Sequence, residues 1–177
     1  MAGREGLVDR RRRVRVYVPA TSTVLRAMYE DATLPAGQTA FAVTAGLREW
    51  YRDDDIEELE YAALLEAARA SLRLLDDDRA AARRRIVVAA DLPDAQVSVR
   101  DDLERGVVRL DAPVPAAQVA SVHVDDGEAD AAVTAAAAAI AEADLGSDSA
   151  QDIVDDAEGF ELQWYATQEI PALLESM

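Results

Sequence analysis

Residues 54–75, with the sequence DDIEELEYAALLEAARASLRLL, form the longest regular pattern in the chain. Asp54 followed by Glu57 three residues later is typical of a helix start. Apolar residues then recur at alternating spacings of four and three, the period of one helix face. They are Tyr61, Leu65, Ala68, Leu72 and Leu75. The pattern predicts a long helix that buries this stripe.

Segments with strand patterns lie on both sides of this helix. Residues Val14–Val18 alternate as Val-Arg-Val-Tyr-Val, which predicts a strand with one strongly apolar face. Further strands are expected at 86–90, 119–124 and 160–166, with 97–99 and 107–110 forming a hairpin. A second helix, rich in alanine, is expected from about Glu128 to Asp144, with Gly146 ending it.

The order of the longer elements predicts an α+β fold. Strand, helix, strand, strand, helix, strand is the order of a ferredoxin-like split βαβ sandwich, here with extra short helices and an inserted hairpin. In that arrangement the strands at Val14 and Val119 are central neighbours, and the strand at Phe160 lies beside the first. A mixed, doubly wound α/β sheet is the alternative. One domain is expected over residues 13–177, preceded at 1–12 by a flexible basic arm.

The two-residue period of a strand assigns side chains to faces. Val14, Val16 and Val18, with Ala120, Val122 and Val124 and with Leu162, Trp164 and Ala166, are expected beneath the helices. The opposite face then gathers the candidate binding residues. These are Arg15, Tyr17, His123, Glu161, Gln163 and Tyr165, together with Ser121 and Asp125.

This polar face has a functional and a structural interpretation. As a site, Arg15 would bind an anionic group, Tyr17 and Tyr165 would stack on a ligand, and His123 or Glu161 would transfer a proton. As structure, it is a solvated sheet face or one covered by other helices or a second subunit. Ser121, His123 and Asp125 superficially resemble a catalytic triad, but same-face neighbours on a strand are about 6.6 Å apart, which argues against one. We therefore assign no catalytic residue.

Composition excludes several function classes. The net charge of -17 comes from 35 acidic residues against 18 basic ones, all of them arginine. Such a charge repels phosphate, so general nucleic-acid binding is not expected, although the basic run Arg10–Arg13 could contact an anionic partner or the protein's own acidic surface. There is no cysteine, and no phosphate-loop or dinucleotide motif. No cofactor and no metal site are predicted.

Several phrases of the sequence resemble a family of small actinobacterial proteins of unknown function. They are RVYVPAT (15–21), AVTAGLRE (42–49), ELEYAA (58–63), VASVHVDD (119–126) and WYATQEI (164–170). The resemblance implies that the residues before Arg13 extend a chain whose relatives begin near the first strand. It agrees with a lysine-free composition that high-GC codon usage explains more simply than a halophilic origin does. It transfers no activity.

Two functional hypotheses follow. The first is a non-catalytic cytoplasmic binding or adaptor domain that uses one sheet face to contact a protein or small molecule. The second is a small-molecule enzyme with acid–base chemistry at His123, Tyr17 and Arg15. Residues 1–9 lack the apolar core of a signal peptide and no membrane-spanning run is found, so a cytoplasmic location is expected. The sequence leaves a homo-oligomer open.

Overall fold

The computed structural model describes residues 12–52 and 54–177. Its helices are α2 (Ser22–Asp31), α3 (Ala45–Tyr51), α4 (Ile56–Asp77), α5 (Asp130–Asp144), α6 (Asp148–Glu158) and α7 (Ile170–Ser176). Its strands are β1 (Arg13–Ala20), β2 (Thr33–Leu34), β3 (Thr39–Ala42), β4 (Ile86–Pro93), β5 (Val97–Val99), β6 (Val107–Leu110), β7 (Val114–Pro115), β8 (Val119–Asp125) and β9 (Leu162–Tyr165). The flexible basic arm was expected at residues 1–12, and residues 1–11 of it lie outside the described part of the chain.

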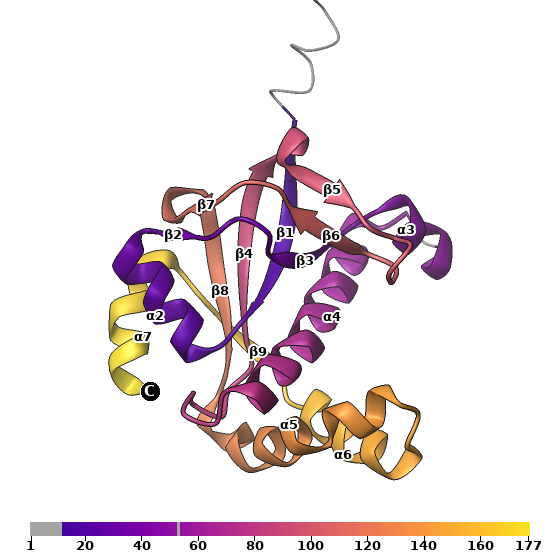
Figure 1. Ribbon diagram of the computed structural model, residues 1–177, viewed down its shortest axis with the longest axis vertical. Helices are drawn as coiled ribbons and strands as arrows, with labels where there is room; N and C mark the ends of the chain where they lie inside the picture. Colours follow the sequence, from indigo (N-terminus) through magenta and orange to yellow (C-terminus); the bar gives the residue numbers. More distant parts are fainter. Residues whose placement is uncertain (1–11, 53) are drawn as a thin grey trace, which may run out of the picture.

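The α+β class is confirmed. Seven strands form one sheet in the order β5-β6-β3-β1-β4-β8-β9, and β2 and β7 form a small second sheet. Every described pairing is antiparallel. The predicted hairpin is present as β5 and β6. Helices lie on both faces of the sheet, with α2 and α7 on one side and α4 on the other (Figure 1).

The ferredoxin-like strand order is not observed, because β4 lies between β1 and β8. Since β3 and β4 are both antiparallel to β1, they are parallel to each other with β1 between them. Helix α4 connects these two strands, so the split βαβ unit begins at the four-residue strand β3 and not at β1. A strand this short carries too little pattern to be recognised as the start of the crossover.

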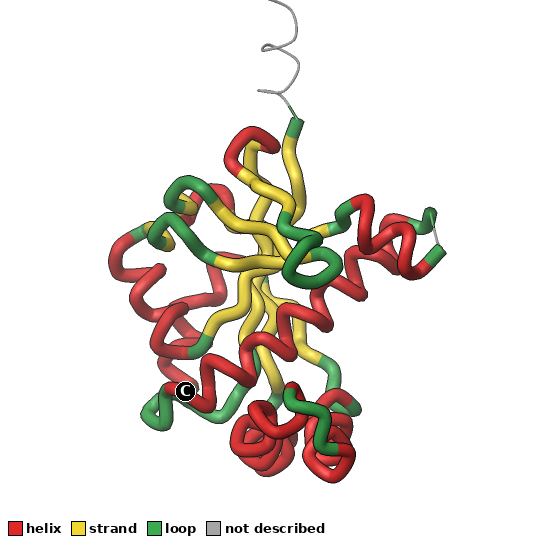
Figure 2. Tube along the Cα trace, turned by 45° about the vertical axis from the view of Figure 1, so that its right-hand side comes forward, coloured by secondary structure: helices red, strands yellow, loops and turns green. Residues whose placement is uncertain are grey.

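A helix that the sequence analysis did not predict explains the position of β9. Helix α6 follows α5 directly, capped by Ser147, whose hydroxyl oxygen accepts a hydrogen bond from the Ala150 backbone N–H. The two helices pack side by side as a hairpin, which brings the chain back to the end of β8 (Figure 2). The next strand therefore pairs antiparallel with β8 at the edge of the sheet.

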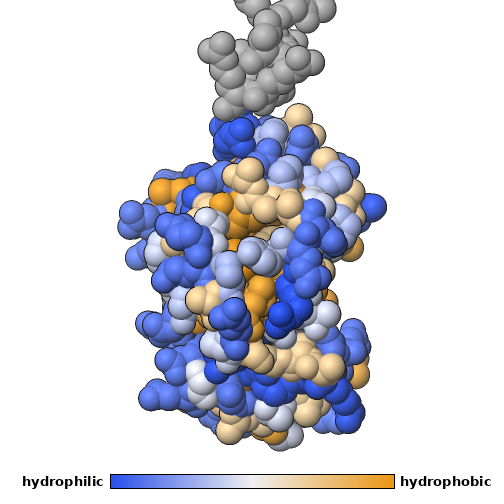
Figure 3. Space-filling model, turned by 90° about the vertical axis from the view of Figure 1, so that its left-hand side faces the viewer, coloured by the Kyte–Doolittle hydropathy of each residue, from blue (hydrophilic) through white to orange (hydrophobic). Residues whose placement is uncertain are grey.

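The valine face of the sheet is buried as predicted. Val16 and Val18 of β1 lie in one core cluster with Val122 and Val124 of β8. Helices α2 and α7 contribute Leu25, Met28, Ile170, Leu173 and Leu174 to the same cluster. Viewed from the α2 and α7 side, the surface is mostly hydrophilic, with apolar atoms in the hollows between polar ridges (Figure 3).

Helix α4 covers the β3, β1 and β4 part of the opposite face. Tyr17, Phe41 and Val87 of the sheet pack there against alanines of the helix. The C-terminal end of α4 contributes Leu72 and Leu75 to a third cluster, formed mainly by the α5–α6 hairpin. The core is therefore built largely from Ala, Val and Leu.

A buried ion pair joins three strands at the end of the sheet nearest the α5–α6 hairpin. Arg85 precedes β4, and its guanidinium donates to both carboxylate oxygens of Asp125 at the end of β8, each at 2.8 Å. The Arg85 backbone N–H donates to the same carboxylate, at 2.8 Å. The guanidinium also donates to the carbonyl of Phe160, just before β9, at 2.9 Å. Both side chains are almost fully buried.

Replacing Asp125 by leucine should strongly destabilise the protein, because Arg85 would keep its buried charge without a partner. We expect a loss of about 3–5 kcal/mol in the free energy of unfolding, measured by urea denaturation. The double variant Arg85→Met with Asp125→Leu should lose much less, since no charge is then buried. Asp102→Asn, which removes an exposed ion pair with Arg100, is the control. A loss from Asp125→Leu no larger than that of the control would refute a structural role for the pair.

Candidate functional site

The structure brings three of the predicted site residues, Arg15, Tyr17 and His123, to one sheet face. Tyr17 lies opposite Ala89 of β4, and Ala89 lies opposite Ser121 of β8, so their side chains point the same way. Arg15 and His123 are each two residues from one of these positions. The predicted grouping of the β1 and β8 residues is therefore present.

Arg15 is held by Asp91 on the neighbouring strand. Its Nε and Nη2 atoms donate to the two carboxylate oxygens of Asp91 at 2.7 and 2.9 Å. This pairing lowers the pKa of Asp91 and raises the pKa of Arg15. A bidentate pair uses the fork of the guanidinium that an anionic ligand would need.

Tyr17 is buried beneath α4. Its hydroxyl donates to a carboxylate oxygen of Glu60 at 3.2 Å. Burial and the negative charge of Glu60 raise the pKa of Tyr17 to about 12. A ring packed in the core offers no face for a ligand to stack on.

The three residues that resemble a triad are only partly connected. The strand lets Ser121 Oγ and His123 Nε2 approach to 3.3 Å, closer than their backbone spacing suggested. Asp125, however, is committed to Arg85 and does not orient the imidazole. Ser121 is 3% exposed. The geometry provides neither an accessible nucleophile nor an orienting carboxylate, both of which a triad needs.

The face predicted for the β9 side chains is wrong. Tyr165 lies opposite Val122 and Gln163 opposite Val124, so both are on the valine face, and Glu161 is an exposed residue before the strand. Trp164 lies opposite His123 instead and is 62% exposed. Apolar spacing placed Leu162 and Trp164 on the valine face, but both sheet faces are partly covered, so apolarity alone does not distinguish them.

A groove that the sequence analysis did not predict runs along the outer side of α4. Two adjoining hollows, with cavity volumes of about 780 and 560 Å³, share Tyr51, Tyr61, Ala62 and Leu65. We call them together the α4 groove. Its aromatic end is lined by Tyr51, Asp55, Glu57, Glu58, Leu59, Tyr61, Ala62 and Leu65. Its ionic end adds Glu66, Arg69, Arg73, Glu104, Ala143, Asp144 and Glu158.

Ion pairs between α4 and the α5–α6 hairpin form the ionic end. Arg73 Nε and Nη2 donate to the two carboxylate oxygens of Asp144 at 2.7 and 3.0 Å. Arg69 donates to Asp144 at 3.2 Å, to Gln151 at 2.9 Å and to Glu158 at 3.4 Å. The two arginines therefore hold the hairpin against the helix and are already satisfied.

The aromatic end exposes residues that the helix pattern predicted to be buried. Ala68, Leu72 and Leu75 of the stripe are buried, but Tyr61 is 51% and Leu65 41% exposed. In its N-terminal half the helix buries Leu59, Ala62 and Ala63 instead. The buried face is therefore rotated about the helix axis relative to the predicted stripe, and Tyr61 and Leu65 lie in the lining of the groove.

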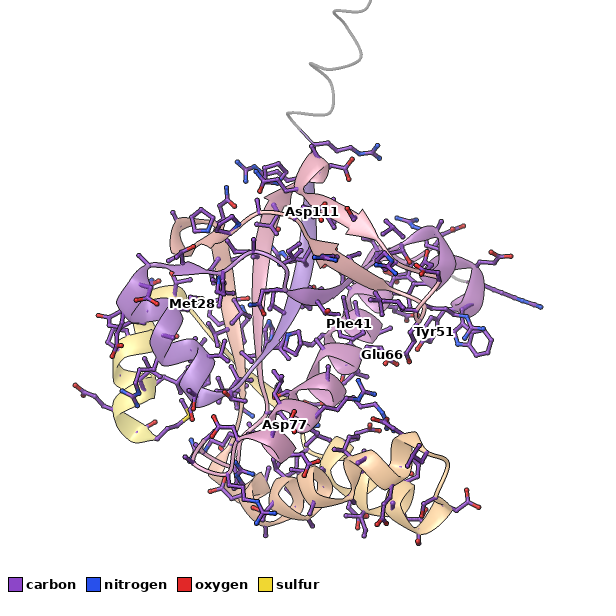
Figure 4. All side chains as sticks on the ribbon, viewed as in Figure 1. Met28, Phe41, Tyr51, Glu66, Asp77 and Asp111 are labelled. Carbon is purple, nitrogen blue, oxygen red and sulfur yellow. The ribbon has the colours of Figure 1, made fainter. Side chains whose placement is uncertain are left out.

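Glu66 and Glu104 add two carboxylates to the lining of the ionic end. Glu66 belongs to α4, whereas Glu104 belongs to the turn between β5 and β6. Burial, and then the charge of Glu104, raise the pKa of Glu66, while Arg69 and Arg73 act in the opposite direction. Figure 4 shows Glu66 next to Tyr51 of α3, above the α5–α6 hairpin.

Asp101 joins the two segments that contribute Tyr51 and Glu104 to the lining of the groove, which are α3 and the β5–β6 turn. Its carboxylate accepts hydrogen bonds from the Thr44 hydroxyl at 2.7 Å and from the backbone N–H groups of Gly46 at 3.2 Å and Gly106 at 3.0 Å. A Cβ at position 46 would lie 2.7 Å from this carboxylate, so glycine allows the close approach. The bonds join the start of α3 to the turn that carries Glu104.

The sequence held only a weak signal for this groove. Thr44 is a typical helix N-cap, and its hydroxyl oxygen accepts a hydrogen bond from the Leu47 backbone N–H at the start of α3, the helix that carries Trp50 and Tyr51. Nothing in the pattern placed these aromatics beside Tyr61, because the contact between α3 and α4 is tertiary. Within residues 12–52 and 54–177 no group of acidic or histidine side chains could hold a metal ion. No helix in those ranges is suited to crossing a membrane.

Comparison with known proteins identifies the family but no function. A model of a family of unknown function, DUF6912, matches residues 14–174. Because the match covers most of the chain, the protein belongs to this family. No curated protein and no solved structure matches the chain.

The single histidine should titrate below its ordinary pKa of 6.5, because burial and the charge of Arg15 disfavour the imidazolium. The stability that depends on neutral His123 is then fully present above pH 6.5 and decreases as the pH falls through the native pKa. NMR of the one imidazole gives the midpoint directly. Arg15→Gln should raise it, since a positive charge is removed and Asp91 loses its partner. A native midpoint at or above 6.5 would contradict this placement.

Proposed function

We propose that this member of the DUF6912 family is a non-catalytic binding or adaptor module that holds its partner in the α4 groove. One observation carries the proposal: large apolar side chains are concentrated in the short stretch 50–65 beside a hollow. Trp50, Tyr51, Ile56, Tyr61 and Leu65 are each between 41% and 59% exposed. Folding alone gains little from leaving such side chains in water.

The shape of the groove also favours binding. Ligand sites are concave, and they combine apolar walls with a few polar groups that fix orientation. The α4 groove has tyrosine and leucine side chains on its walls and carboxylates among them. Contiguous exposed apolar surface with a polar rim is typical of interaction sites.

The alternative of an acid–base enzyme at Arg15, Tyr17 and His123 gains no comparable support. Each of these side chains already bonds to a group of the protein itself: Arg15 to Asp91, Tyr17 to Glu60 and His123 to Ser121. The raised pKa of Tyr17 and the lowered pKa of His123 both follow first from burial, which structural residues share. The predicted binding roles of Glu161, Gln163 and Tyr165 are not part of this proposal.

The proposal includes the setting in which the module works. The absence of cysteine and the use of arginine alone as the basic residue suit the cytoplasm of a high-GC actinobacterium. The carboxylates of the groove would repel phosphate groups, so the partner is not nucleic acid.

Selection of a random-sequence peptide library on the immobilised full-length protein tests the groove. Tyr61→Ser should weaken binding of the enriched peptides by about tenfold or more, the effect expected for an aromatic anchor. Tyr29→Ser is the matched control, because Tyr29 is also a helical tyrosine, 52% exposed, but lies on α2. Affinities are measured by fluorescence polarisation. If enrichment fails, or if both variants bind like the wild type, the α4 groove is not the binding site.

A further inference from the structure

We infer that the partner in the α4 groove is a protein segment that carries arginine or lysine among apolar residues. This inference rests on the proposed function and specifies the chemistry of the partner. Four properties of the groove carry it: charge, the Glu66–Glu104 pair, the tyrosine rings and the length.

The lining of the groove is strongly acidic. Seven carboxylates line it, against the two guanidinium groups of Arg69 and Arg73. Both guanidiniums are bonded to Asp144, and Arg69 also to Glu158. Among the residues that the structure describes, the aromatic end is lined by three carboxylates and by no basic side chain. A cationic partner complements this charge, whereas an anionic one is repelled.

Glu66 and Glu104 provide a specific position for a cation. Both carboxylates line the ionic end, Glu66 partly buried and Glu104 exposed, and the charge of Glu104 adds to burial in raising the pKa of Glu66. An ammonium or guanidinium group placed between them would convert repulsion into two ion pairs.

The tyrosines favour the same partner. Cations bind to the faces of aromatic rings, and guanidinium groups do so most often. The chain already contains such a contact at the edge of the groove: the Arg105 guanidinium lies 3.5 Å from the centre of the Trp50 ring. Tyr51 and Tyr61, both about half exposed, offer equivalent faces within the groove.

The length of the groove indicates a peptide and not a small organic cation. Its lining extends along α4 from Glu57 to Arg73, which at 1.5 Å per residue is about 24 Å. An extended segment of about seven residues spans this distance. A free polyamine could neutralise the carboxylates but would leave Leu65 and the tyrosine rings uncovered.

The same library selection gives the first test. Enriched peptides should contain more arginine and lysine than the starting library, interspersed with apolar residues. Enriched peptides that need Tyr61 but are neutral or acidic would overturn this inference and leave the binding function standing. Failure to enrich any peptide that needs Tyr61 would instead overturn the proposed function itself.

Charge-matched variants give the second test, with the most enriched peptide as the probe. Glu57→Gln, Glu66→Gln and Glu104→Gln together should weaken its binding by about tenfold, because three favourable charges are removed at contact distance. The control replaces Glu30, Glu128 and Glu175 by glutamine, which are exposed and outside the groove. It has the same net charge but should change affinity by less than about twofold at physiological salt. Circular dichroism verifies that both variants fold.

Each remaining outcome is decisive. Equal weakening by the two triple variants would mean that the peptide responds only to overall charge, which contradicts a site in the groove. A version of the peptide with citrulline in place of arginine should bind at least tenfold more weakly; equal binding would overturn the inference. Spermine that displaces the peptide at equal or lower concentration would assign the groove to a free polyamine instead of a protein segment.

Discussion

The arrangement of the sheet and the α5–α6 hairpin depends on the buried pair of Arg85 and Asp125. Its hydrogen bonds connect the start of β4, the end of β8 and the Phe160 carbonyl that precedes β9. The α5–α6 hairpin begins just after Asp125 and ends just before Phe160. In a medium of low dielectric, an arginine with all these partners defines one geometry, because any displacement leaves a charge unpaired. The pair thus fixes where the hairpin leaves the sheet and where it returns.

The shape of the α4 groove follows from this anchor. Helix α4 packs on the sheet along its middle, and its C-terminal part reaches the hairpin through Arg69 and Arg73. The N-terminal part is flanked by α3 and by the β5–β6 turn, which Asp101 joins together. One helix therefore spans two separate supports, and the space between them is the groove. The positions of both walls are set by polar contacts that the hydrophobic pattern does not encode.

Local sequence patterns predicted the elements better than their arrangement. The alternation at Val14–Val18 and the helical period of α4 identified the strand and helix at the centre of the fold, because burial imposes these periods. The strand order depended on the short strand β3 and on helix α6, which carry weak patterns, and the order was wrong for that reason. The two-residue period of the strands grouped Arg15 and His123 correctly. It assigned the wrong face to the β9 side chains, because both sheet faces are partly covered and apolar residues therefore occur on both. Periodicity also assigned Tyr61 to the core, although this part of α4 buries Leu59, Ala62 and Ala63 on a different face of the helix.

The excess of acidic residues distinguishes the two polar regions, which are the sheet face around His123 and the α4 groove. The chain has 35 acidic and 18 basic residues, so there are too few arginines to pair with every carboxylate. Three structural ion pairs use one arginine each: Arg15 with Asp91, Arg85 with Asp125 and Arg73 with Asp144. The sheet face around His123 is satisfied in this way, so its polarity is accounted for by folding. In the part of the chain that the structure describes, the aromatic end of the α4 groove is lined by carboxylates and exposed rings and by no arginine, whereas Arg105 lies over the ring of Trp50. Exposed rings beside carboxylates contribute little to folding, and on this ground we propose that the groove binds a cationic segment of another protein.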